Sequence, residues 1–219
     1  MRKWIVLTAV FLCLAIAGPV QALNVVPTTG DLTIVRNGSD WQQLRYTDDG
    51  VLKTPYSGRF HTFLTTQGGK TIDTYSYCID PNKTFIWNTP FKVGIDEPVG
   101  TNYAKAAWLV YNYDPYFGRT SISDNKGEVA AALQLAVWST IVEGFRIGTN
   151  TGSIDSLFAA MTGALNGVDT GGLQGMFYAA ISSDRQSQLV AAPVPEPATM
   201  LLMGIGLLGL GVVGRKRIK

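Results

Sequence analysis

The chain has 219 residues, a formal net charge of +2 and 46% hydrophobic residues, which is enough for one sizeable domain or two small ones. Between residues 23 and 197 the charge reverses, with 12 Lys and Arg against 16 Asp and Glu. The basic excess therefore lies at the two ends of the chain. No basic patch is visible between them, which argues against nucleic acid as a partner.

The first 22 residues have the three parts of a secretory signal peptide. Two cations precede an apolar run over residues 4–17, and Val20-Gln21-Ala22 forms a cleavage site. We expect cleavage after Ala22, which removes Cys13 and leaves Cys78 as the single cysteine of the exported part. An intramolecular disulfide is then impossible, so the lone thiol has to be buried or used in an oxidising compartment.

The last 22 residues form a second apolar segment. Residues 198–214 are apolar and Gly-rich, and a helix of this length spans about 26 Å, enough for a thin bilayer. A basic cluster follows the apolar run and is expected to stay cytoplasmic: Arg215, Lys216, Arg217 and Lys219. Together with the preceding Val194-Pro195-Glu196-Pro197, this arrangement resembles the PEP-CTERM sorting signal.

The resemblance implies that the tail is an address and a temporary membrane anchor. Its expected partner is exosortase, a membrane-embedded, cysteine transpeptidase-like enzyme of Gram-negative bacteria that also make exopolysaccharide. The protein would pass through the inner membrane and reach the cell surface or the extracellular biofilm matrix. The predicted organisation is a signal peptide (1–22), an α+β domain (23–185), a linker with the PEP motif (186–197), and a membrane helix with its basic tail (198–219).

The exported domain is predicted to be α+β, with a β-rich N-terminal half, a sheet or small barrel, packed against a helical half. Strands are expected at residues 32–36, 59–65 and 71–79, where β-branched and aromatic residues dominate, with a hairpin turn at 67–70. Helical spacing of apolar residues predicts helices at 102–113, 128–143 and 153–166, and a weaker one at 172–183. The polar segment from residue 182 is expected to be a linker.

A glutamine stands out in the longest predicted helix. Gln134 lies within the apolar stretch AALQLAVWST, and Cys78 lies 56 positions upstream on a predicted strand. A buried amide needs hydrogen-bond partners, and leaving one unpaired costs roughly 1–3 kcal/mol. If the helix packs on the sheet, the Cys78 thiolate could attack the Gln134 carbonyl, expel ammonia and leave a thioester. That product needs a dry surround, for which Tyr77, Trp108, Tyr111 and Trp138 are candidates.

At these positions the chain resembles the thioester domains of bacterial surface adhesins. The matching stretches are Tyr77-Cys78-Ile79, and Leu133-Gln134-Leu135-Ala136-Val137-Trp138 at the TQxA-type motif, which adds Ala136 to the expected site. The resemblance implies a Cys78–Gln134 thioester that acylates a partner nucleophile, a protein lysine or a polysaccharide hydroxyl, in a covalent adhesin or matrix protein. Such chemistry acts once per molecule and is not enzymatic turnover, and it needs no cofactor.

Two alternatives remain open at this point. Cys78 could be a buried small hydrophobe and Gln134 a satisfied core amide, which predicts a non-covalent matrix or binding protein. Cys78 could instead be the nucleophile of a cysteine hydrolase with His61, the only histidine, as its base. Metal binding has little support, because Asp73, Asp80 and Asn82 are clustered without a calcium-loop or zinc-ligand spacing.

Overall fold

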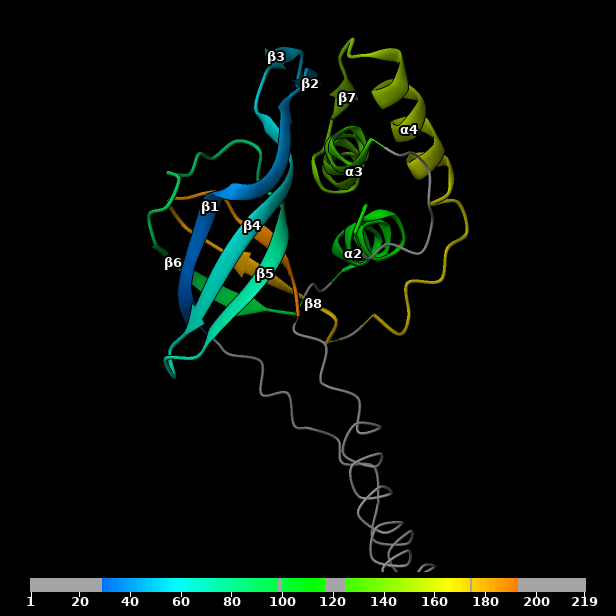
Figure 1. The fold of residues 1–219 in the computed structure, drawn as a ribbon. Coiled ribbons are helices and arrows are strands. Elements are labelled where there is room, and N and C mark those ends of the chain that lie inside the picture. Colours follow the sequence, from blue (N-terminus) through cyan, green and yellow to red (C-terminus); the bar gives the residue numbers. More distant parts are fainter. Residues whose placement is uncertain (1–28, 98–99, 117–124, 174, 193–219) are drawn as a thin grey trace, which may run out of the picture. The chain divides into compact units, whose positions relative to one another are not determined.

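The computed structural model describes residues 29–97, 100–116, 125–173 and 175–192. Six of the described strands close into an antiparallel barrel in the order β1-β4-β5-β9-β8-β6, and β3-β2-β7 form a small separate sheet. The described helices lie together on one side of the barrel (Figure 1). The elements are β1 (Thr29–Gln43), β2 (Tyr46–Asp48), β3 (Val51–Lys53), β4 (Tyr56–Thr66), β5 (Thr71–Cys78), β6 (Phe91–Asp96), α2 (Thr101–Tyr113), α3 (Lys126–Ile141), β7 (Arg146–Ile147), α4 (Gly152–Gly163), β8 (Phe177–Ile181) and β9 (Gln188–Ala191).

The mixed α+β fold is confirmed, and the first-half strands follow the predicted pattern. β4 and β5 pair as a hairpin through the predicted turn, where Thr66 N–H donates to the Lys70 carbonyl at 2.9 Å and Gly69 takes a φ of 79°. In β1 the pairing with β4 shifts register between Val35 and Asp40, next to Gly38 with a φ of 77°. This irregularity bends the long strand so that it can join the barrel.

Helix α3 is the central helix of the domain. Asn125 caps its start by accepting a hydrogen bond from Glu128 N–H at 3.2 Å. All residues from Val129 to Trp138 are buried, because the helix packs between strands β1 and β4 on one side and helices α2 and α4 on the other (Figure 1). A helix that is apolar all round belongs in a core, and here it brings Gln134 into the core with it.

The predicted helix at 172–183 is wrong. Phe177–Ile181 instead form strand β8, which pairs with β6 and β9 and buries Phe177 and Tyr178. The predicted linker is also wrong over residues 188–191, which form β9 between β5 and β8. Four of the polar residues in the segment that indicated a linker are buried, namely Ser182, Gln186, Ser187 and Gln188. Ser76 Oγ, for example, donates to Gln188 Oε1 at 3.0 Å. The folded domain therefore extends past residue 185.

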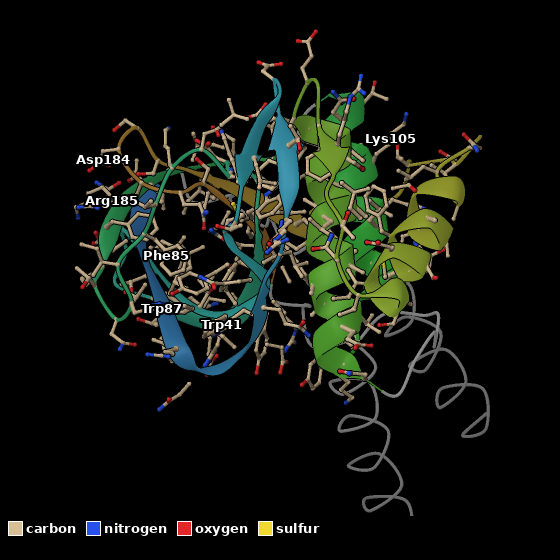
Figure 2. The ribbon with its side chains drawn as sticks, turned by 90° about the horizontal axis from the view of Figure 1, so that it is seen from above. Trp41, Phe85, Trp87, Lys105, Asp184 and Arg185 are labelled. Atoms are coloured by element: carbon tan, nitrogen blue, oxygen red, sulfur yellow. The ribbon has the colours of Figure 1, made fainter. Side chains whose placement is uncertain are left out.

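Aromatic side chains from the segment after β5 cover one end of the barrel. Figure 2 shows Phe85, Trp87 and Trp41 gathered on the barrel, away from the helices. Phe85 and Trp87 meet edge to face with ring centroids 4.7 Å apart, and both contact buried Phe60 at 5.4 and 5.9 Å. Trp41, Phe85 and Trp87 are partly buried and pack against the main core cluster, to which Phe60 belongs.

Several predicted features lie outside the described residues. These are the signal peptide, the membrane helix, the basic cluster of Arg215, Lys216, Arg217 and Lys219, and the motif Val194, Pro195, Glu196 and Pro197. Within the part of the chain that the structure describes, no helix is long and apolar enough to cross a bilayer.

Candidate functional site: the Cys78–Gln134 pair

At Cys78, the last residue of β5, the main-chain N–H and carbonyl are not hydrogen-bonded to either neighbouring strand. The β4–β5 pairing stops at Phe60 opposite Ser76, so β4 does not reach Cys78. On the other side, Ile79 N–H donates to the Ser187 carbonyl at 3.0 Å, which directs the N–H and carbonyl of Cys78 away from β9. Cys78 is fully buried, and buried main-chain groups have to be hydrogen-bonded.

The side chain of Gln134 pairs with both of these groups. Cys78 N–H donates to Gln134 Oε1 at 2.7 Å, and Gln134 Nε2 donates to the Cys78 carbonyl at 2.8 Å. Gln134 is fully buried on α3. The carboxamide thus continues the β-ladder where β4 has ended. This contact explains why a glutamine is tolerated in the middle of an apolar helix.

The thiol of Cys78 is held in a dry environment. Burial raises its pKa well above the usual value for a cysteine, while the Asp80 N–H and the Trp138 side chain lower that pKa in part. Trp138 is fully buried, and its indole N–H has no hydrogen-bond partner within normal limits among the described residues. The free donor is therefore available to a negatively charged sulfur.

The other predicted shell residues differ in their placement. Tyr77 and Ala136 are fully buried, and the Tyr77 hydroxyl donates to Asp114 Oδ2 at 2.8 Å. Trp108 and Tyr111 are only half-buried on α2, where they pack against the same core, and Trp108 meets Tyr113 edge to face at 5.9 Å. Of these predicted shell residues, Trp138 is the one whose side chain acts on the Cys78 thiol.

A buried ion pair next to the site has no clear signal in the sequence. Arg59 Nε donates to Asp114 Oδ2 at 3.0 Å, and the guanidinium lies 3.2 Å from the ring centroid of Tyr75. The same carboxylate oxygen accepts the Tyr77 hydroxyl, so this pair supports the residue that precedes Cys78. Arg59 lies within a predicted strand, and Asp114 follows the predicted helix at 102–113. Local sequence patterns do not relate residues so far apart.

His61 is engaged elsewhere and does not serve Cys78 as a base. Its Nδ1 lies 3.0 Å from the Asn37 carbonyl, its Nε2 lies 2.7 Å from Asp73 Oδ1, and its ring stacks on Tyr75. A cysteine hydrolase needs a base beside Cys78, and among the described residues His61 does not take that position. No group of three metal-ligating side chains occurs in the described ranges.

Comparisons with known proteins agree with the resemblance noted in the sequence. The family model of the thioester domain matches residues 75–167, and the model of the PEP-CTERM protein-sorting motif matches residues 193–217. The N-terminal thioester domain of a surface protein from Clostridium perfringens is similar in structure, with a TM-score of 0.46 and 10% identity, over 74% of this chain and 97% of that one. No curated protein matches the chain. The chain thus carries a segment similar to the thioester domain and, after it, a segment that matches the PEP-CTERM protein-sorting motif.

Proposed function

We propose that this is an exported surface or matrix protein whose Cys78 and Gln134 form an internal thioester that acylates a partner. The family matches support the two parts of this proposal, the thioester chemistry and the sorting. The observation that carries the residue assignment is the pair of hydrogen bonds, 2.7 and 2.8 Å long, that join the Gln134 carboxamide to the main chain of Cys78.

These hydrogen bonds suit an attack of the Cys78 sulfur on Gln134 Cδ. Negative charge develops on Oε1 as the tetrahedral intermediate forms, and the Cys78 N–H already points at that oxygen. A donor placed in advance in a dry site stabilises such an oxyanion far more than water does. The second hydrogen bond fixes the amide plane and directs Nε2, the leaving nitrogen, toward the Cys78 carbonyl.

Formation of the thioester balances without any other reagent. The Sγ–Cδ bond forms, the Cδ–Nε2 bond breaks, and the thiol proton is transferred to Nε2, which leaves as ammonia. In the second step a partner amine or hydroxyl attacks Cδ, and the Cys78 sulfur leaves with a proton. The result is an amide or ester bond to the partner and a free thiol. Because the thioester is not regenerated, each molecule reacts once.

Burial explains how such a reactive bond survives before the partner arrives. Cys78, Gln134 and Trp138 are all inaccessible to solvent, so water is kept from the acyl carbon. A thiolate leaves more readily than an amide nitrogen, which makes the thioester the reactive state and the amide the inert one. Covalent adhesion or cross-linking to a protein lysine or a polysaccharide hydroxyl is the function that this chemistry supports.

Intact mass of the exported protein tests the thioester directly. The thioester is expected to make the wild-type chain lighter by one ammonia than the same chain without it, and added methylamine should open the bond and leave a methylamide on Gln134. Cys78→Ala and Gln134→Ala should each remove the methylamine-reactive deficit. A wild-type chain that never reacts with methylamine, with Cys78 free to alkylate after denaturation, would make Gln134 only the structural partner of the Cys78 main chain.

Sorting provides a separate prediction. If the tail is processed by exosortase in a Gram-negative cell envelope, replacing Pro195, Glu196 and Pro197 by alanine should leave the protein in the inner membrane. Fractionation of inner membrane, surface and medium measures this, with the thioester variants as controls that sort normally. Unchanged display of the alanine variant at the surface would remove the sorting step from the proposal.

A further inference from the structure

Three side chains with complementary chemistry meet beside the thioester site. Lys53 Nζ donates to Asp48 Oδ2 at 2.9 Å, and Asn82 Nδ2 donates to the same oxygen at 3.0 Å. Lys53 Nζ also contacts Asn82 Oδ1. An amine, a carboxamide and a carboxylate therefore touch one another, and the carboxylate lies between the two nitrogens.

Two segments of the fold hold these three side chains together, the β2–β3 hairpin and the segment after β5. Asp49 and Gly50 both have positive φ, so β2 and β3 are joined by a tight turn that puts Asp48 and Lys53 diagonally across the hairpin. Asn82 belongs to the segment after β5, where its N–H donates to Asp80 Oδ1 at 3.3 Å. Asp48 and Lys53 are partly covered, with side chains 12% and 31% exposed, and Asn82 is exposed.

We propose that Lys53 and Asn82 form an intramolecular amide cross-link, with Asp48 as the group that moves the proton. The Lys53 Nζ–Asn82 Cγ bond forms and the Asn82 Cγ–Nδ2 bond breaks. Asp48 accepts the two protons that Lys53 Nζ loses, one after the other, and passes each to Nδ2, which leaves as ammonium. The net reaction converts an ammonium and a primary amide into a secondary amide and an ammonium ion, so it needs no oxidant or other reagent.

The position of Asp48 suits both transfers. Its Oδ2 lies within hydrogen-bond reach of the attacking and the leaving nitrogen at once, which is the geometry required of a general base that then acts as an acid. Hydrogen bonds from Lys53 and Asn82 lower the pKa of the Asp48 carboxyl, so it is ionised near neutral pH. A lower pKa makes the carboxylate a weaker base, so the transfer depends on its direct contact with both nitrogens.

The cross-link would fix the loop that follows the reactive cysteine. Asn82 is four residues after Cys78, and the N–H of Asp80 in the same loop helps to stabilise the Cys78 thiolate. Joining Lys53 to Asn82 closes a loop of about 30 residues, and on the chain-entropy model this raises the melting temperature by on the order of 10 °C. The proposal does not depend on the thioester, which forms between different residues.

Mass spectrometry separates the two reactions. The exported wild-type protein is expected to be lighter by two ammonias, of which methylamine reverses only the one at Gln134. After methylamine treatment, digestion at Lys and Arg should give residues 46–59, uncleaved at Lys53, joined to residues 71–83 through one amide bond. After methylamine, an intact mass equal to that of the sequence with or without one methylamide at Gln134, together with normal cleavage at Lys53, would overturn the cross-link whatever the state of the thioester.

Variants test the role of each residue. Lys53→Arg keeps the charge but should abolish the methylamine-resistant deficit and the branched peptide, whereas the matched variant Lys83→Arg should retain both. Asp48→Asn should slow formation of the branched peptide about 100-fold, because the proton acceptor is lost. A branched peptide that persists in Lys53→Arg, or forms at the wild-type rate in Asp48→Asn, would contradict the assignment.

Discussion

Replacing Asp114 by alanine is expected to lower the free energy of unfolding by about 3–5 kcal/mol. The Asp114 side chain is fully buried and Arg59 is only 4% exposed, so the substitution removes the carboxylate from a guanidinium that stays in the core. It also removes the acceptor of the Tyr77 hydroxyl and of Tyr116 N–H, 2.8 and 2.9 Å away. Denaturant unfolding monitored by tryptophan fluorescence measures the loss as a lower midpoint at an unchanged slope.

The matched control is Asp31→Ala, which breaks an ion pair of similar length at the surface. Asp31 Oδ2 lies 2.8 Å from Lys92 Nζ, but the two side chains are 38% and 87% exposed. Solvent screens such a pair, and its loss is expected to change stability by less than about 1 kcal/mol. If Asp114→Ala costs no more than this control, the other contacts of Arg59 are sufficient for its charge, and the Asp114 carboxylate is not what stabilises it.

Local sequence patterns predict best those strands and helices whose spacing of apolar residues matches the face that is buried along the whole element. The hairpin of β4 and β5 has alternating residues and a glycine turn at Gly69, and the structure contains it nearly as predicted. Helix α3 was predicted at residues 128–143 from the helical spacing of its apolar residues, and it begins and ends two residues earlier, at Lys126 and Ile141. In both cases the signal comes from residues that are neighbours in the chain.

Strands β8 and β9 pair with each other, but each was missed because its second partner is distant in sequence, β6 for β8 and β5 for β9. β9 lies next to β5 in the barrel, and the buried Gln188 bonds with Ser76, 112 positions away. Without knowledge of that partner, a run of Ser, Asp and Gln resembles solvent-exposed linker. The polar residues are tolerated inside because each finds a hydrogen bond there, as Gln188 Nε2 does with Gln186 Oε1 at 3.1 Å.

The residues of the candidate site could be predicted from local motifs, but the contact between them could not. Two short motifs indicated Cys78 and Gln134 as a pair, and an amide in an apolar helix indicated an unusual need for a partner. The main-chain contact that meets this need depends on where β4 stops pairing with β5, at Phe60 opposite Ser76. The residue at which two strands stop pairing depends on the whole barrel and not on the local sequence. The cluster of Lys53, Asp48 and Asn82 likewise arises only when the β2–β3 hairpin meets the loop after β5.

Replacing Trp138 by phenylalanine is expected to slow thioester formation about 10- to 100-fold while the protein stays folded. The change removes the indole N–H, one of two groups that lower the raised pKa of the Cys78 thiol. Trp138 is fully buried and packs against Tyr46 with ring centroids 5.3 Å apart, and phenylalanine retains most of this contact. We expect a loss of about 1–2 kcal/mol in the free energy of unfolding, less than a change to alanine costs. Intact mass at successive times after synthesis follows the loss of ammonia.

The control for this prediction is Trp108→Phe, on half-buried α2, which should form the thioester at the wild-type rate. Equal slowing in both variants would indicate a general loosening of the core instead of a role for the Trp138 N–H.

The pH dependence gives an independent check of the thiolate mechanism. Burial raises the pKa of the Cys78 thiol, so the thiolate is the minor form near neutral pH, and its population rises about tenfold for each unit of increasing pH. Wild-type and Trp138→Phe should therefore both react faster as pH rises, with the variant slower at every pH below its own thiol pKa. A formation rate that does not change with pH would mean that the thiol proton is not lost before the sulfur attacks, and the indole N–H would then have no thiolate to stabilise.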